Sequence, residues 1–310
     1  MKSFVKDGLK EIVLPPRLRR GDKIGIAAPA SPFESETFRQ GVETLKQLGF
    51  EPVIPEGLFE EKNYLAGSDE HRAGQLNALF SDETIRAVIC ARGGYGTLRI
   101  LSGLDFDLIR SNPKILVGFS DVSSLLSTVF IQSGLVTFHG PMVTSLAGTR
   151  EEMGQALLAA VSGDHPLTIS PKKPVVLQGG TGSGPVAGGN LTTLCHLLGT
   201  PFEPAWKGHI LFLEDVGEAV YRIDRMLTQL KLAGCLDGLT GIVLGTFKDC
   251  GDQDAVYRLV MDLVDADGPP IVAGFDIGHG DANVTLPIGL TATLDADRGV
   301  LSYHSAATQA

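Results

Sequence analysis

Short apolar runs alternate with helical patterns through the first half of the chain. The runs are brief and rich in β-branched residues, which is typical of strands inside a sheet, and the segments between them repeat apolar positions every three or four residues. The expected strands are 23–28, 50–54, 85–90, 115–119 and 135–138. This repeated β-α-β order predicts an open, mostly parallel, flavodoxin-like sheet with both faces covered by helices.

The second half carries more strand-like segments and fewer helical crossovers. The expected strands are 209–213, 241–247, 270–274, 291–294 and 300–303, of which the last two form a hairpin. This pattern predicts a smaller, β-rich α/β domain. The fold class is therefore α/β with two domains.

Residues 166–184 differ in composition from both halves, because proline, lysine and glycine dominate them. Such a segment is typical of a linker, which places an N-terminal domain at 1–165 and a C-terminal domain at 185–310. The glycine run at 179–184 offers a phosphate cradle as an alternative. It lacks the Gly-Lys-Ser/Thr ending of a P-loop and precedes its strand, so a flexible connection is the favoured interpretation.

Charge and composition narrow the class of function. The 310 residues are 43% hydrophobic, enough for a substantial core, and their net charge of −10 argues against nucleic acid or an anionic membrane as a partner. The four cysteines form no C-x-x-C pair, which predicts buried thiols in a reducing compartment and no metal site. No signal peptide or membrane-spanning run is seen, so the expected location is the cytoplasm.

A serine stands where one buried strand meets a helix. The apolar run 115–119 ends at Ser120, and apolar residues then follow with helical spacing. A serine on such a turn, beside the free N–H of Asp121, has the geometry of a nucleophile elbow. Val122 departs from the G-x-S-x-G pattern of hydrolases, and capping of the helix is the alternative role of Ser120.

A serine nucleophile needs a basic histidine, which a carboxylate must orient. His279 lies between two glycines in a loop after a strand, and His139 has a similar position as a rival base. Glu214 directly follows an apolar strand, where a charge is costly unless it is paired. Asp215 and Glu218 are alternative carboxylates that also suit helix capping. The favoured order along the chain is Ser120, Glu214 and His279.

Several spaced motifs resemble those of the LD-carboxypeptidase family of serine peptidases, the muramoyltetrapeptide carboxypeptidases, over nearly the whole length. The matching segments are GDKIGIAAPASP (21–32), ARGGYG (91–96), VGFSD (117–121), HGPM (139–142), GGNL (188–191), LGTP (198–201), FLED (212–215), GH (278–279) and TLPIG (285–289). Their order makes the resemblance more specific than any one motif, and it favours catalysis over capping for Ser120.

The resemblance implies a catalytic triad of Ser120, Glu214 and His279 divided between the two domains. It also implies an oxyanion hole formed by the N–H of Asp121 and that of Gly94 or Gly93.

The resemblance further implies hydrolysis of the bond that releases terminal D-alanine from a cell-wall tetrapeptide during recycling. No metal or organic cofactor is expected. The expected partner is a small peptide or muropeptide substrate, and the protein is expected to be a homodimer. His139 is expected to line or brace the substrate pocket. Our own hypothesis is that Arg92, which begins the glycine loop, binds the substrate carboxylate.

Three other functions were weighed. A microcin-immunity peptidase of the same family cleaves acyl-aminoacyl-adenylates. The single Trp206 could stack on the nucleobase, although a lone tryptophan more often belongs to a core or an interface. A non-catalytic two-domain protein would only hold a ligand in its cleft. A nucleotide-binding oxidoreductase is disfavoured because no G-x-G-x-x-G follows a strand.

Overall fold

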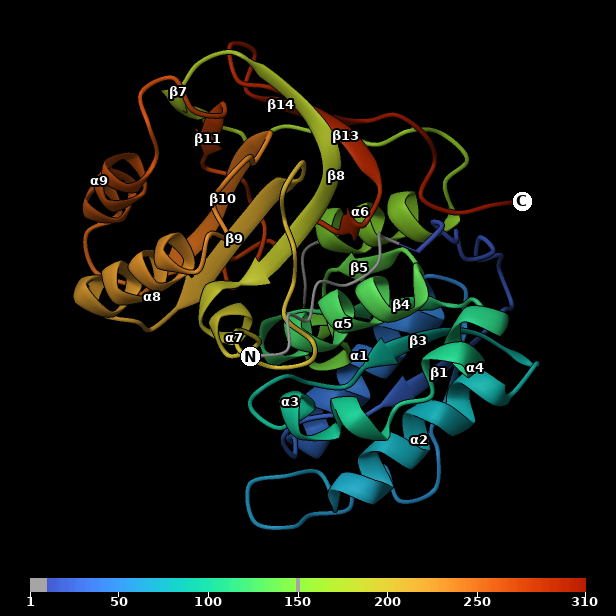
Figure 1. The fold of residues 1–310 in the computed structure, drawn as a ribbon. Coiled ribbons are helices and arrows are strands. Elements are labelled where there is room, and N and C mark those ends of the chain that lie inside the picture. Colours follow the sequence, from blue (N-terminus) through green and yellow to red (C-terminus); the bar gives the residue numbers. More distant parts are fainter. Residues whose placement is uncertain (1–9, 149–150) are drawn as a thin grey trace.

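The structure, a computed structural model, describes residues 10–148 and 151–310. Its strands form two sheets, one mainly from each half of the chain (Figure 1). All four cysteines are buried free thiols, as expected. Within the described ranges, no helix combines the length and apolar character that crossing a membrane requires.

The first sheet has six strands in the order β12-β5-β4-β3-β1-β2. Strands β1 to β5 pair in parallel, whereas β12 comes from near the C-terminus and pairs antiparallel with β5. The bounds are β1 Lys23–Ala27, β2 Glu51–Val53, β3 Ile85–Cys90, β4 Ile115–Gly118, β5 Thr137–His139 and β12 Leu286–Ile288. The mostly parallel sheet expected for the first half is confirmed.

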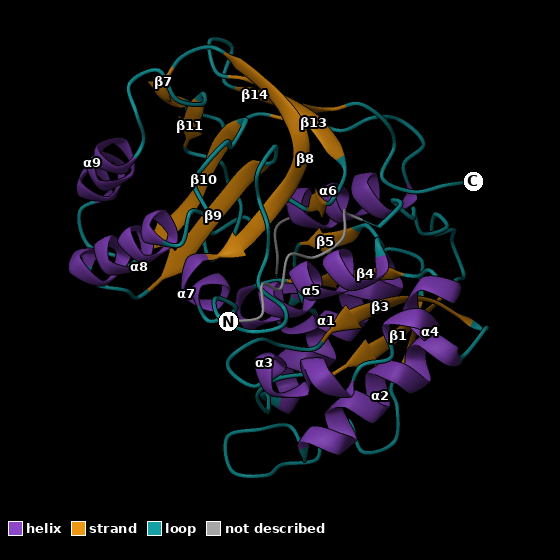
Figure 2. Ribbon diagram, in the orientation of Figure 1, coloured by secondary structure: helices purple, strands orange, loops and turns teal. Residues whose placement is uncertain are grey.

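Helices cover both faces of this sheet (Figure 2). They are α1 Ser35–Gln47, α2 Asp69–Ser81, α3 Thr97–Ile100, α4 Phe106–Ser111, α5 Ser123–Ser133 and α6 Glu151–Ser162. Successive residues of a strand point to opposite faces. In β4, Ile115 and Val117 share a core with α1 and α6, and Leu116 shares the other core with α2, α4 and α5.

The second sheet has eight strands in the order β6-β14-β13-β8-β9-β10-β11-β7. Its centre, β8 to β11, is parallel, and antiparallel strands extend it on both sides. The strands are β6 Thr168–Ile169, β7 Val175–Gln178, β8 Thr181–Asn190, β9 Ile210–Val216, β10 Gly241–Lys248, β11 Ile271–Ala273, β13 Thr291–Asp295 and β14 Val300–Tyr303. The helices of this half are α7 Leu191–Cys195, α8 Val220–Leu232 and α9 Gln253–Leu263. This β-rich half agrees with the expected fold class.

The interpretation of 166–184 as a flexible connection needs correction. These residues form β6, β7 and the beginning of β8, the long curved strand of Figure 1. A Cβ on Gly182 would lie 1.6 Å from the carbonyl oxygen of Thr240, and one on Gly184 would lie 2.2 Å from that of Gly208. Glycine at 182 and 184 therefore allows the backbone of Thr240 and Gly208 to pack directly against β8. The predicted domain division itself stays a prediction.

Candidate active site

Ser120 begins a short 3₁₀ turn, Ser120–Val122, between β4 and α5. Its φ is +63°, in the left-handed region that a serine rarely adopts, so this turn carries strain. A Cβ on Gly118 would lie 2.5 Å from Cγ1 of Val122. Glycine at 118 therefore makes room for valine at 122, which explains how the elbow tolerates its departure from the hydrolase pattern.

A continuous chain of hydrogen bonds joins Ser120, His279 and Glu214. Nε2 of His279 lies 3.1 Å from Oγ of Ser120, and Nδ1 of His279 lies 2.6 Å from Oε2 of Glu214. Glu214 ends the apolar run of β9, and His279 lies in the loop after β11. The three predicted side chains thus meet where strands of the two sheets end, in the arrangement that lets a histidine take a proton from a serine.

The carboxyl group of Glu214 is fully buried. Burial raises its pKa above the ordinary value, and the hydrogen bond from His279 acts in the opposite direction. A Cβ on Gly278 would lie 2.4 Å from Oε2 of Glu214. Glycine at 278, with a φ of +106°, therefore lets the histidine loop pack directly onto the carboxylate.

The two alternative carboxylates have other partners. Asp215 accepts hydrogen bonds from the side chain of Asn190, from the backbone N–H and hydroxyl of Thr192, and from Val216. Glu218 forms an ion pair with Arg222 at the surface. Both therefore have structural roles, and Glu214 is the carboxylate that reaches a histidine.

His139 is not the base, and its predicted contact with substrate needs correction. Its ring is fully buried between Phe119 and Phe212, with ring centroids 5.9 and 4.9 Å away. Phe119 in turn lies 4.9 Å from the ring of His279. Burial, and secondarily the proximity of His279, lower the pKa of His139 to about 3. A fully buried neutral ring can brace Phe119 but presents no surface to a ligand.

The glycine loop lies against the nucleophile. A Cβ on Gly93 would lie 3.0 Å from Cβ and 3.2 Å from Oγ of Ser120. The backbone N–H groups of Gly93 and Gly94 donate no hydrogen bond to any residue within the described ranges. Both predicted glycines therefore stay candidates for the oxyanion hole, and Asp121 supplies an N–H at the first turn after Ser120.

Asp121 also has a role that the sequence interpretation missed. Its carboxylate accepts hydrogen bonds from the backbone N–H and the hydroxyl of Thr97, each 2.9 Å long. Thr97 is the first residue of α3, directly after the glycine loop. The side chain of Asp121 therefore ties the elbow to the glycine loop, and burial raises its pKa above the ordinary value. The position of Asp121 directly after Ser120 was the available signal in the sequence. The predicted oxyanion hole uses only the backbone N–H of this residue and gives its carboxylate no role.

Arg72 of α2 is a second missed residue, with 1% of its side chain exposed. It donates hydrogen bonds to the carbonyl oxygens of Pro29 and Gly96, and it forms an ion pair with Asp69. It therefore joins the loop after β1 to the glycine loop. No pattern along the chain distinguishes Arg72 from a solvent-exposed helical arginine, because its partners are backbone oxygens.

Arg92 and Trp206 differ in their exposure to solvent. The guanidinium of Arg92 is exposed and donates a hydrogen bond of 2.8 Å to the carbonyl of Pro32. Trp206 is only 3% exposed and belongs to the hydrophobic core. A buried indole cannot stack on a nucleobase, and the core position is the one that a single tryptophan more often takes.

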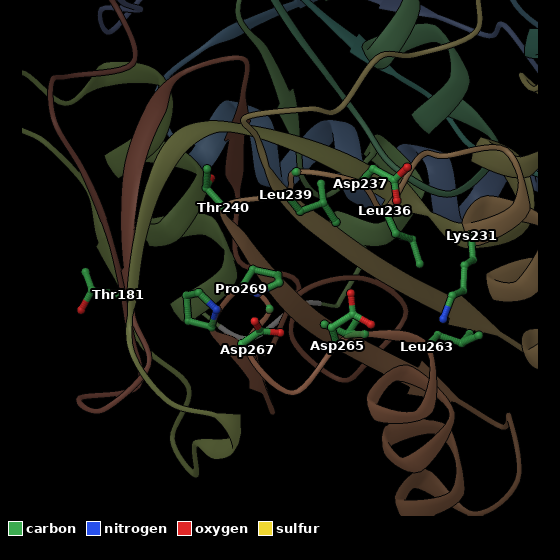
Figure 3. Close-up of a pocket in the computed structure, with 14 residues that line it drawn as sticks. Thr181, Lys231, Leu236, Asp237, Leu239, Thr240, Leu263, Asp265, Asp267 and Pro269 are labelled. Atoms are coloured by element: carbon green, nitrogen blue, oxygen red, sulfur yellow. The ribbon is translucent and has the colours of Figure 1, made fainter.

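A cavity of about 530 Å³ opens beside His279. It is lined by Phe119, Met153 and Asp281 among others, from both halves of the chain. A second cavity, of about 520 Å³, lies near the start of β10 and β11 and includes Lys231, Asp237 and Asp265 (Figure 3). None of the three triad residues lines it. Of these two cavities, only the one beside His279 is lined by a residue of the hydrogen-bonded chain.

Comparison with protein families agrees with this geometry. The model of the LD-carboxypeptidase N-terminal domain matches residues 24–140, and that of the LD-carboxypeptidase C-terminal domain matches residues 183–294. The chain belongs to the LD-carboxypeptidase family. Ser120 lies in the range matched by the N-terminal model, and Glu214 and His279 lie in the range matched by the C-terminal model. All three hydrogen-bonded residues therefore fall within the domains of this serine-type peptidase family.

Named relatives of this LD-carboxypeptidase family member fall into two groups. A probable murein peptide carboxypeptidase of Bacillus subtilis is 37% identical, with 91% of each chain covered. A murein tetrapeptide carboxypeptidase of Pseudomonas aeruginosa is 35% identical, covering 89% of this chain and 94% of that protein. The microcin C7 self-immunity protein MccF of Escherichia coli is 30% identical, covering 91% of this chain and 93% of its own.

Solved structures show the same two groups. An MccF-like protein from Bacillus anthracis superposes with a TM-score of 0.90 at 26% identity, covering 94% of this chain and 99% of that one. A muramoyltetrapeptide carboxypeptidase from Oxalobacter formigenes gives a TM-score of 0.79 at 29% identity, covering 91% and 97%. The two-domain fold is therefore shared with both groups.

Proposed function

We propose that this member of the LD-carboxypeptidase family is a serine carboxypeptidase that releases the terminal D-alanine of murein tetrapeptide. The observation that carries the proposal is the hydrogen-bonded chain from Ser120 through His279 to the buried Glu214. The proposed place of this reaction is cell-wall recycling in the cytoplasm, and the proposed assembly is a homodimer, which light scattering would test.

The proposed reaction has two steps. Oγ of Ser120 bonds to the carbonyl carbon of the third residue while Nε2 of His279 takes its proton. The C–N bond then breaks, and the same proton passes from His279 to the amine of the departing D-alanine. Water attacks the resulting ester, gives a proton to His279, and Ser120 regains its proton as the tripeptide leaves. Glu214 stabilises the imidazolium form in both steps.

Developing negative charge on the carbonyl oxygen needs donors that are already in place. The N–H of Asp121 and an N–H of the glycine loop are proposed to supply them. Arg92 remains the proposed partner of the substrate carboxylate, for which its hydrogen bond to Pro32 would hold the guanidinium near the glycine loop. If Arg92→Ala leaves both kcat and KM for tetrapeptide unchanged, this role is wrong.

The experiment incubates the wild type and Ser120→Ala with anhydromuramyl-tetrapeptide and with the pentapeptide, and follows free D-alanine by mass spectrometry. Release from tetrapeptide alone, abolished in the variant, is the expected result. No release from either substrate would refute the proposal, and release that survives in Ser120→Ala would refute the assignment of the nucleophile.

Cleavage of acyl-aminoacyl-adenylates is the second candidate function, because several structural relatives are MccF proteins. The buried Trp206 argues against it, since it removes the one indole available for stacking. The same assay with an aminoacyl-sulfamoyl-adenosine as competitor separates the two functions. Inhibition at concentrations far below those of tetrapeptide would favour the adenylate reaction.

A further inference from the structure

The loop at 29–32 contains Ser31, which contacts the glycine loop. This loop follows β1, and the glycine loop 92–96 follows β3. Because β1 and β3 pair in parallel, the two loops leave the sheet at the same edge. The sheet therefore places Ser31 beside the glycine loop that borders Ser120.

Ser31 holds the peptide groups on both sides of Gly94. Its backbone N–H donates to the carbonyl oxygen of Gly93 at 3.3 Å. Its Oγ accepts a hydrogen bond of 3.1 Å from the N–H of Tyr95. The first bond fixes the peptide between Gly93 and Gly94, and the second fixes the peptide between Gly94 and Tyr95. Together they set φ and ψ at Gly94.

The orientation of the first peptide bears on which glycine supplies the oxyanion donor. In a trans peptide the C=O and N–H point in opposite directions. The carbonyl of Gly93 points to Ser31, so the N–H of Gly94 points away from Ser31. Within the described residues that N–H donates no hydrogen bond, so it is available to bind the oxyanion of a substrate.

Gly94 can take this conformation only because it lacks a side chain. Its φ is +107°, and a Cβ there would lie 2.5 Å from Oγ and 2.7 Å from Cβ of Ser31. The two residues are therefore in direct contact, and Ser31 occupies the space beside the glycine. A side chain at position 94 would therefore move the loop.

We propose that Ser31 is a positioning residue for the oxyanion hole: it holds the N–H of Gly94 toward the oxyanion that forms when Ser120 attacks. This inference rests on the proposed peptidase function and takes Gly94 rather than Gly93 as the donor of the glycine loop. Ser31 contacts Gly93, Gly94 and Tyr95, so it acts through the backbone of the glycine loop.

The test compares wild type, Ser31→Ala, Ser31→Thr and the control Ser102→Ala, whose side chain is exposed. Loss of a direct oxyanion donor costs about 10²–10³-fold in kcat. Because Ser31→Ala leaves the donor in place but loosens it, we expect a fall in kcat on the order of tenfold with KM within about twofold. Ser31→Thr keeps the hydroxyl and should restore most of kcat, and Ser102→Ala should match wild type.

A second readout separates positioning from a general structural role. A tetrapeptide-derived aldehyde forms a tetrahedral adduct with Ser120, whereas intact tetrapeptide bound to a Ser120→Ala background does not. Ser31→Ala should weaken the aldehyde by the same factor as kcat and leave tetrapeptide affinity unchanged in calorimetry.

Equal losses for both ligands, or no loss for either, would overturn the inference, and so would a kcat equal to that of wild type. Failure of the proposed function gives a different result, because wild-type protein would then release no D-alanine from tetrapeptide.

Discussion

At the end of β4 the chain holds Ser120 through backbone geometry, whereas Glu214 within β9 and His279 in the loop after β11 are held through burial and charge. The first region has a left-handed serine and a glycine loop secured by hydrogen bonds to Asp121 and Arg72. The second has a buried carboxylate with one histidine partner and a glycine in contact with it. Substitutions should therefore affect backbone conformation in the first region and protonation in the second.

The largest losses of kcat are expected for Ser120→Ala and Glu214→Gln. Loss of the nucleophile should lower kcat on the order of 10⁵-fold or more, because the covalent route disappears. Glu214→Gln keeps the shape but removes the charge that stabilises the imidazolium, and should cost on the order of 10⁴-fold. Measurement of kcat on tetrapeptide checks both. A Glu214→Gln enzyme within about tenfold of wild type would remove Glu214 from the proposed triad.

Gly278→Ala tests whether contact with the carboxylate matters beyond backbone strain. Its Cβ would lie 2.4 Å from Oε2 of Glu214 and would push the histidine loop away. Displacements of this kind cost about 100-fold in rate, so kcat should fall by that order. Gly21→Ala is the matched control, since Gly21 has a φ of +86° with no atom within 4 Å of its Cβ position.

Both glycine variants should lose about 1 kcal/mol or more of stability from strain at positive φ, as measured by urea unfolding. Only Gly278→Ala should also lose activity. Equal activity losses in the two variants would contradict the proposed role of this contact.

A separate effect concerns His139 and the pH dependence of stability rather than activity. In the unfolded chain its pKa is near 6.5, and burial lowers it to about 3 in the folded protein. Between these values the unfolded chain binds the proton and the folded protein does not. The stability contribution is therefore complete above about pH 6.5 and is lost as pH falls toward 3.

His139→Phe keeps the aromatic packing against Phe119 and Phe212 and removes the proton. Between pH 7 and 4, wild type should lose up to about 3 kcal/mol more unfolding free energy than this variant. His165→Phe, at a side chain that is 90% exposed, is the control and should follow wild type. Parallel curves for wild type and His139→Phe, measured by urea unfolding at each pH, would show that His139 titrates as an exposed histidine does.

The pattern of apolar residues was sufficient to predict the parallel strands β1 to β5 of the first sheet and the position of Ser120, but it did not predict β12. This follows because a buried parallel strand must be continuously apolar and its end must carry polar groups, so both features are local in sequence. Glu214 was also recognisable, since a charge at the end of an apolar strand requires a partner. The mistaken connection at 166–184 shows the limit, because its glycines are explained by the distant backbone of Thr240 and Gly208.

The sequence by itself therefore determined which polar residues follow the apolar runs. Among these residues, the family motifs identified Ser120, Glu214 and His279. Only the tertiary structure decided that His279 rather than His139 reaches Ser120, that Trp206 is buried, and that Arg72 and Ser31 secure the glycine loop. The physical reason is that burial and hydrogen-bond partners depend on residues far apart in the chain. Every residue has a backbone oxygen that can accept such a bond, whatever its side chain. The residue type therefore does not indicate which backbone oxygens will be acceptors.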